Sequence, residues 1–215
     1  MVERSLQELD FDALTAREFF PSPPAWEDQV LYFLMLDRFS DGREKDCRDN
    51  DGGWVTHGAT RRFQPSDAEN AMETPESRER WREAGGRWVG GTLRGLKSKI
   101  GYLERLGVTA IWISPVFKQT AFQETYHGYG IQNFLDVDPH FGARRDLREM
   151  VRTAHEHGIH VILDIILNHS GNVFQYSPDR HWTQDPGSGD WRIDPRWDGG
   201  LYSVKGFNDK YGNPD

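Results

Sequence analysis

The segment from Gly158 to His169 constrains the fold of this chain more than any other. It reads GIHVILDIILNH, a run of branched apolar residues followed by three polar ones, Asp164, Asn168 and His169. An apolar run between turn signals is typical of a strand covered on both faces, as in a parallel sheet. Polar residues where such a strand ends lie at the carboxyl edge of the sheet, where α/β proteins carry their chemistry. Asp164 is therefore a candidate functional residue, and the alternative is a buried carboxylate that only supports packing.

Two further apolar runs, residues 29–36 and 108–115, predict two more strands earlier in the chain. The segments between the three strands have apolar residues at spacings of three and four, which predicts amphipathic helices. The first helix begins after Thr92 as N-cap and ends at Gly107, and the second ends at Gly158. Their apolar positions are Leu93, Leu96, Ile100, Leu103 and Leu106, then Leu147, Met150, Val151 and Ala154. This alternation predicts an α/β fold with a parallel sheet and right-handed crossovers.

The segments outside this alternation suggest three regions. Residues 1–25 form an amino-terminal extension that ends at the proline cluster of residues 21–24. Residues 26–169 carry the strand and helix pattern, with extended residues 131–137 and a turn at 138–142. Residues 170–215 are rich in Gly, Pro, Asp and Trp, which predicts an irregular excursion with short strands near 191–193 and 201–204.

The long polar connection over residues 41–91 is a candidate calcium-binding segment. Acidic residues stand at positions 41, 44, 46, 49 and 51, and Asp37 precedes them at the end of the first strand. Carboxylate oxygens are the ligands that calcium prefers, and Asp37 and Asp41 are the candidates here. The spacing does not fit the EF-hand pattern, so a solvated loop with one short helix near residues 75–84 is the alternative.

The net charge of −8 argues against nucleic-acid and anionic-membrane partners, since both select basic surfaces. The single cysteine, Cys47, excludes an intrachain disulfide. The first residues lack a basic head followed by an apolar stretch, and no segment approaches the roughly 20 apolar residues of a membrane span. We therefore expect a cytoplasmic protein with no membrane association.

Five motifs in order resemble the α-amylase superfamily, glycoside hydrolase family 13. Asp164 to His169 matches the D-x-x-x-N-H motif that ends the family's third barrel strand. The other four are residues 37–42, residues 90–117, His127-Gly128-Tyr129, and residues 136–142. The resemblance implies the amino-terminal part of a (β/α)8 TIM barrel, about three strands, followed at residues 170–215 by the beginning of an inserted B domain. The functional groups of such a barrel stand at the carboxyl ends of its strands.

The resemblance also implies roles for individual residues. Tyr129 would stack on the sugar at the cleavage subsite, and His127 and His169 would bind its hydroxyls, while Asp164 would support the polar network. Asn168 would supply an oxygen to calcium, and no organic cofactor is implied. Aromatic faces and imidazoles suit the apolar face and the hydroxyls of a pyranose. The alternative for His127 and Tyr129 is a hydrogen-bonded loop pair without a ligand.

The implied activity is retaining hydrolysis or transglycosylation of α-1,4- or α-1,6-linked glucans. Gly130 and Asn133 depart from the family, which often has Trp and Asp at these positions, and the departures put substrate preference in doubt. The family's nucleophile, acid/base and third catalytic carboxylate follow later strands, and no G-x-R-x-D motif stands after His169. We therefore expect this chain to be inactive alone. A non-catalytic maltooligosaccharide-binding protein is the alternative, while the absence of G-x-G-x-x-G opposes a nucleotide-binding domain.

Overall fold

The computed structural model describes residues 3, 5–60, 74–120, 124–171, 175–176, 182–184, 187–188, 191–193 and 204–205. Its helices are η1 (Leu6–Glu8), α1 (Phe11–Thr15), η2 (Trp26–Asp28), η3 (Leu36–Arg38), α2 (Pro75–Ala84), α3 (Leu93–Lys97), α4 (Ile100–Arg105) and α5 (Arg144–Glu156). Its strands are β1 (Leu31–Leu34), β2 (Cys47–Arg48), β3 (Trp54–Val55), β4 (Ala110–Ile113), β5 (Phe117–Gln119), β6 (Ile131–Val137), β7 (His160–Leu163), β8 (Gln175–Tyr176), β9 (Trp182–Gln184), β10 (Trp191–Ile193) and β11 (Val204–Lys205). None of the helices in these ranges is long and apolar enough to cross a membrane.

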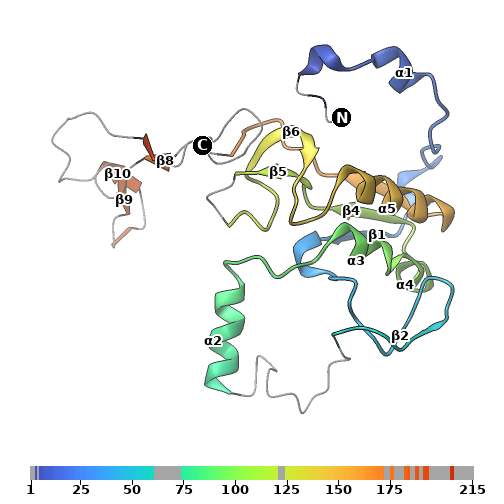
Figure 1. The fold of residues 1–215 in the computed structure, drawn as a ribbon, viewed down its shortest axis with the longest axis horizontal. Helices are drawn as coiled ribbons and strands as arrows, with labels where there is room; N and C mark the ends of the chain where they lie inside the picture. The colour runs from blue at the N-terminus through green and yellow to red at the C-terminus, as the bar shows by residue number, and fades with distance from the viewer. Residues whose placement is uncertain are drawn as a thin grey trace.

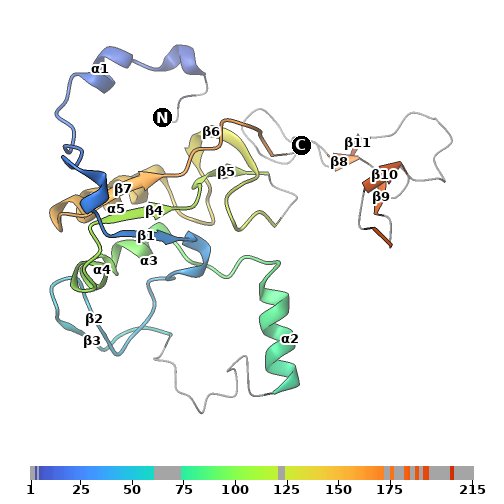
Figure 2. The ribbon, with the colours of Figure 1, turned by 180° about the vertical axis from the view of Figure 1, so that it is seen from behind.

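A parallel sheet in the order β1-β4-β7 forms the centre of the fold (Figure 1). Its register aligns Leu31 with Ala110 and Ala110 with His160, so the three strands end at one edge. Figure 2 shows the same strands from behind. The predicted parallel α/β arrangement is confirmed, although each strand has four residues and is shorter than the apolar run that predicted it.

Helices cover one face of this sheet and form the core. Ile111 and Ile113 of β4 are fully buried beneath α3, α4 and α5. The predicted apolar positions of these helices pack there, namely Leu93, Leu96, Ile100, Leu103, Met150 and Ala154. Burying each of these leucine, isoleucine and methionine side chains stabilises the fold by about 1.5–3 kcal/mol relative to exposure.

The opposite face of the sheet is open in the described part of the chain. Phe33 and Trp112 occupy one row across the strands, and they are 48% and 39% exposed. Their rings meet edge to face at 5.3 Å. Coverage of both faces was predicted for β7, whose four residues are all partly buried, so full coverage is not reached in the described part of the chain. In a (β/α)8 barrel this inner face is covered only when all eight strands close the sheet into a cylinder, and three strands cannot do so.

The helix predicted from Thr92 to Gly107 is divided into α3 and α4. Thr92 caps α3 as predicted, because its Oγ1 accepts from the Gly95 N–H at 3.0 Å. Ser98 ends α3 by donating its hydroxyl to the Gly95 carbonyl at 2.7 Å. Leu106, predicted on the apolar face, is the C-cap residue of α4 and is 55% exposed, while Ile100 and Leu103 are buried as predicted.

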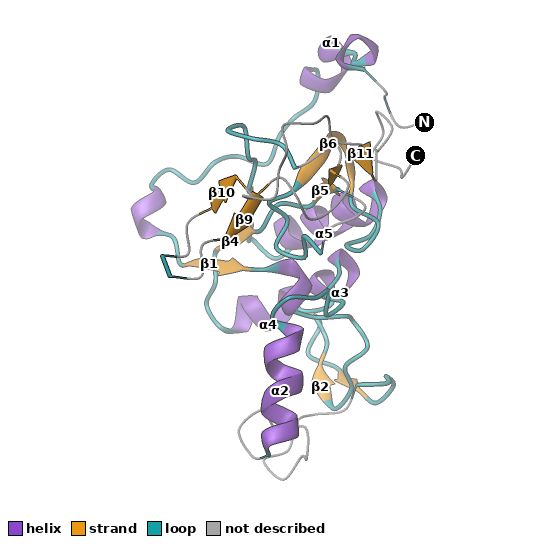
Figure 3. Cartoon of the chain, turned by 90° about the vertical axis from the view of Figure 1, so that its left-hand side faces the viewer, coloured by secondary structure: helices purple, strands orange, loops and turns teal. Residues whose placement is uncertain are grey.

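Antiparallel pairing was not predicted, and it joins β8 with β11 and β9 with β10 as well as the two pairs that follow. β2 pairs with β3 inside the polar connection, and β5 pairs with β6. The predicted short helix is present as α2, which extends away from the sheet (Figure 3). β10 lies at the predicted residues 191–193, while β11 begins at Val204 and residues 201–203 lie outside the described ranges. The division at residues 25 and 169 stays a prediction.

Candidate functional site

Polar side chains gather where the three parallel strands end. Asp164 directly follows β7, and its N–H donates to the Ile113 carbonyl at 3.3 Å, which continues the ladder beyond the strand. Ser114 follows β4 and ties β1 to it, because its Oγ accepts from the Leu36 N–H at 3.1 Å. The carboxyl ends of parallel strands are where barrels carry functional groups.

Tyr129 and Asp164 form the centre of the candidate site. The Tyr129 hydroxyl donates to Oδ2 of Asp164 at 2.9 Å, although the residues are 35 positions apart. Burial and this hydrogen bond raise the pKa of Tyr129, so the phenol stays protonated and keeps donating. The contact joins the loop before β6 to the end of β7, as the predicted roles require.

His127 and His169 both contact the backbone of Tyr129. Nδ1 of His127 accepts from the Tyr129 N–H at 3.0 Å, and the two rings stack with centroids 5.6 Å apart. Nε2 of His169 donates to the Tyr129 carbonyl at 3.1 Å. The structure therefore brings together all four predicted residues, and the side chains of Tyr129 and both histidines are partly accessible. An aromatic face beside two imidazoles can bind a ring that carries hydroxyl groups.

Asp37 and Asp41, which were predicted to bind calcium, do not belong to the cluster around Tyr129. Asp37 is buried, and its carboxylate accepts from the N–H groups of Val89 at 2.9 Å and Gly90 at 3.0 Å. The Asp41 carboxylate accepts from the Arg43 N–H at 2.8 Å in a local turn. The carboxylate oxygens of both residues already accept hydrogen bonds, so a structural role explains their presence without a metal ion.

Asn168 is exposed, and its amide donates to Nδ1 of His169 at 3.3 Å. Over the ranges that the structure describes, no three His, Cys, Asp or Glu side chains stand together as a metal site. The residues present do not converge as cation ligands, so no step of a mechanism is derived from calcium. Calcium at Asn168, Asp37 or Asp41 stays a prediction.

Two residues beside the site were missed by the sequence reasoning. The Arg38 guanidinium lies 4.1 Å from the Tyr126 ring centroid, next to the ring of His127. Gln119 is buried beneath the loop that carries Tyr129. Arg38 had a signal, since it follows Asp37 at the end of the first strand. Gln119 had no such signal, because the residues to which it bonds are not related to it by helical or strand periodicity.

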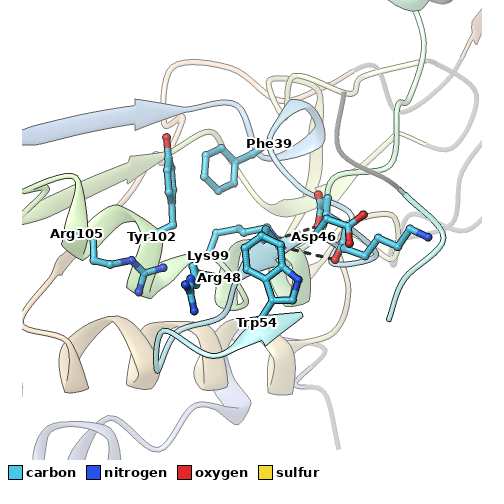
Figure 4. A pocket seen from close by; sticks show the side chains of 10 residues that line it. Phe39, Asp46, Arg48, Trp54, Lys99, Tyr102 and Arg105 are labelled. Carbon is cyan, nitrogen blue, oxygen red and sulfur yellow. Dashed lines mark hydrogen bonds and ion pairs between the residues drawn. The ribbon is translucent and has the colours of Figure 1, made fainter. Parts of the chain in front are cut away.

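A separate cavity of about 580 Å³ lies between the β2–β3 hairpin and α4 (Figure 4). Trp54 and Tyr102 line it, together with Phe39, Lys99 and Arg105. Two of its cations have partners, because Lys99 pairs with Glu44 at 3.2 Å and Arg105 donates to the Asp49 carbonyl at 3.1 Å. None of its lining residues belongs to the cluster around Tyr129. These contacts explain how the hairpin is held on α4.

Comparison with known proteins agrees with the motif order. The model of the alpha-amylase catalytic domain matches residues 57–208. A beta/alpha-amylase of Paenibacillus polymyxa is 32% identical over 194 residues, which are 86% of this chain and 14% of that protein. Alpha-amylase 2 of Dictyoglomus thermophilum is 46% identical over 148 residues, which are 68% of this chain and 20% of that protein.

A solved structure, the alpha-amylase from Geobacillus thermoleovorans complexed with acarbose, is 30% identical. The match covers 69% of this chain and 25% of that one, with a TM-score of 0.45. The chain thus spans between 14% and 20% of the length of the two curated relatives described above.

Proposed function

Because this chain belongs to the α-amylase family, glycoside hydrolase family 13, we propose that the whole protein cleaves or transfers α-1,4- or α-1,6-linked glucans with retention. The observation that carries the proposal is the cluster of Tyr129, His127, His169 and Asp164, which joins the loop before β6 to the end of β7. Tyr129 stacks on a glucose ring in this proposal, and the imidazoles bind its hydroxyls. Asp164 fixes the phenol of Tyr129.

The bond-breaking carboxylates are proposed to lie beyond these 215 residues. Retaining glycosidases need two carboxyl groups about 5–5.5 Å apart. The nearby acids on the described residues have other partners, since Asp138 accepts from the Gln119 N–H at 2.8 Å and from Nδ1 of His140 at 2.7 Å. Asp164 is held by Tyr129. A coding frame that continues past Asp215 to a G-x-R-x-D segment would support this division, and a stop codon there would contradict it.

The direct test is glucan binding and cleavage by the protein expressed from its whole reading frame. We expect it to bind maltotriose in calorimetry and to release reducing ends from maltoheptaose. Tyr129→Ala should weaken binding about tenfold or more, because burying a large aromatic side chain is worth about 1.5–3 kcal/mol. Tyr102→Ala is the matched control, since that tyrosine is half-exposed and lines the separate cavity.

The outcomes separate the two classes of function. Binding with cleavage supports the enzyme. Binding with neither released reducing ends nor transfer products of altered chain length, even with the whole frame, would indicate a maltooligosaccharide-binding protein instead. A protein that does not bind any tested glucan, or one whose binding is equally affected by Tyr129→Ala and Tyr102→Ala, would contradict the proposed site.

Glucan affinity is expected to fall in acid through His127. Burial lowers the pKa of this imidazole below its usual value of 6.5. The neutral ring accepts the Tyr129 N–H, and protonation removes that acceptor. Because the folded pKa is depressed, the stabilisation of the loop is fully present above pH 6.5 and is lost as pH falls through the folded value.

Calorimetric titrations with maltotriose between pH 7.5 and 5 would measure this loss. The pH dependence should disappear in His127→Gln and remain in His155→Gln. His155 also has a lowered pKa, from burial and from His160, but it stacks on Phe20 away from the site. An identical pH dependence in the wild type and His127→Gln would contradict the role of His127.

A further inference from the structure

The loop that carries His127 and Tyr129 is held from below by one side chain, that of Gln119. This residue ends β5 and is 2% exposed. Its Oε1 accepts from the Gly130 N–H at 2.8 Å, and its Nε2 donates to the Gly128 carbonyl at 3.0 Å. The same Nε2 donates to the Phe117 carbonyl at 2.7 Å. The amide therefore binds the backbone on both sides of Tyr129.

Only an amide of this length can make all of these contacts. A buried backbone group left without a partner costs free energy comparable to a lost hydrogen bond. A glutamate could accept from Gly130 but could not donate to the Gly128 and Phe117 carbonyls. A methionine would fill the volume and make none of the three contacts. Gln119 itself is anchored, because its N–H donates to the buried carboxylate of Asp138 at 2.8 Å.

The close approach of three chain segments explains why glycine stands at position 130. A Cβ on Gly130 would lie 2.5 Å from Cγ2 of Thr125 and 3.4 Å from Oε1 of Gln119. Gly171 is equally restricted, since a Cβ there would lie 2.4 Å from the Gly130 carbonyl oxygen. The Gly171 N–H donates to the Ile131 carbonyl at 2.6 Å. The Thr125 side chain thus occupies the space that a Cβ at position 130 would need, while Gln119 lies at ordinary contact distance and holds the Gly130 N–H.

This packing also positions the other partners of Tyr129. Gly171 lies two residues after His169, whose Nε2 reaches the Tyr129 carbonyl. The Thr120 N–H donates to the Gly130 carbonyl at 3.1 Å, next to Gln119 in the chain. A shift of the loop would therefore change the distance of Tyr129 from both Asp164 and His169.

We propose that Gln119 is a positioning residue of the glucan site, setting Tyr129 against Asp164 and His169 without touching the sugar. The proposal rests on the proposed function, and it adds that Gly130 and Gln119 form one unit that shapes this wall of the cleft. Substrate contact is made by Tyr129 and the histidines, while Gln119 acts through the backbone of residues 128 and 130.

The test compares Gln119→Met and Gln119→Glu with the wild type in the protein expressed from its whole reading frame. We expect Gln119→Met to lower kcat/KM for maltoheptaose by up to about 10²-fold, the size of effect that a misplacement of about 1 Å produces. Gln119→Glu keeps one of the three contacts but places a carboxylate oxygen against the Gly128 and Phe117 carbonyls, so its kcat/KM should fall at least as much. Gln29→Met is the control, because that amide makes a single contact, to the Ala25 carbonyl at 3.2 Å, outside the site.

A second readout does not depend on activity. The ring carbon that bears the Tyr129 hydroxyl, labelled with carbon-13 and assigned with Tyr129→Phe, reports the hydrogen bond to Asp164. We expect its signal to move in Gln119→Met and to stay in Gln29→Met. If Gln119→Met does not fold, Gly130→Ala disturbs the same packing from the other side and should move the same signal.

The results separate failure of the positioning role from failure of the function. A folded Gln119→Met protein with unchanged kcat/KM and an unchanged Tyr129 signal would overturn the proposal. If the wild type neither binds nor cleaves glucans, the proposed function fails. The carbon-13 signal of Tyr129 then tests by itself whether Gln119 positions Tyr129. Movement of the signal in Gln119→Met supports the positioning role, and an unmoved signal overturns it.

Discussion

Replacing Asp164 with alanine is expected to lower kcat/KM for maltooligosaccharides about 10²-fold or more, with the protein still folded. Asp164 is half-buried at the end of β7, and it accepts the Tyr129 hydroxyl at 2.9 Å. Without this acceptor the phenol loses its fixed position, and a displacement of about 1 Å near the reacting groups costs about 10²-fold in rate. Steady-state kinetics on the protein from its whole reading frame measures the effect.

Graded variants show whether the Tyr129 contact carries the effect. Asp164→Asn keeps the shape and an acceptor oxygen but loses the charge, and hydrogen bonds to ionised groups are about twice as strong as neutral ones. The decrease in kcat/KM should be smaller for Asp164→Asn than for Asp164→Ala. In a double-mutant cycle with Tyr129→Phe, residues in contact couple by about 0.5–3 kcal/mol. Additive effects of the two substitutions, or an Asp164→Ala enzyme within twofold of the wild type, would show that this contact does not support the site.

Replacing Asp37 with alanine is expected to lower the free energy of unfolding by about 1–3 kcal/mol, the cost of leaving buried N–H donors without their acceptor. Asp37 is 1% exposed, and Nε of Arg38 lies 3.1 Å from its carboxylate. Its other partners are the N–H groups of Val89 and Gly90, more than fifty residues away. Arg38 in turn donates to the Ala84 carbonyl at 2.6 Å. The substitution would leave these donors unpaired and release the connection between α2 and α3.

Denaturant unfolding of the protein from its whole reading frame measures the change, with Asp41→Ala as control. Asp41 is more exposed and makes only local contacts and a long one to Thr60, so its loss should cost about 1 kcal/mol or less. The comparison also tests the calcium prediction. If Asp37 binds calcium, a chelator should destabilise the wild type about as much as Asp37→Ala does. Unfolding that is unchanged in chelator, together with a large effect of Asp37→Ala, would assign Asp37 to hydrogen bonding.

The sequence by itself determined the order of the central strands and helices, because each depends on a local pattern. The Thr92 cap acts within three residues, and the second helix ends where Gly158 adopts a φ of +70°. Apolar periodicity selected the residues that pack on β4, since period and burial are linked in a helix. The prediction of a single long helix was wrong. Ser98 bonds to Gly95 where α3 ends, although the apolar periodicity continues into α4.

The motifs also gave the members of the candidate site: Asp164 and His169 follow a predicted strand, and His127 and Tyr129 belong to a motif of the family resemblance. Only the tertiary structure decided how they meet. The contact of Tyr129 with Asp164 spans 35 residues. The hydrogen bonds of Gln119 to the loop, and those of Asp37 to Val89, join segments whose pairing follows no periodic sequence pattern. A hydrogen bond between distant segments depends on the path of the whole backbone, and a single sequence carries no repeating signal for it. The motifs of the family resemblance therefore name the chemical groups of this site, while the contact of the loop before β6 with the end of β7 determines their geometry.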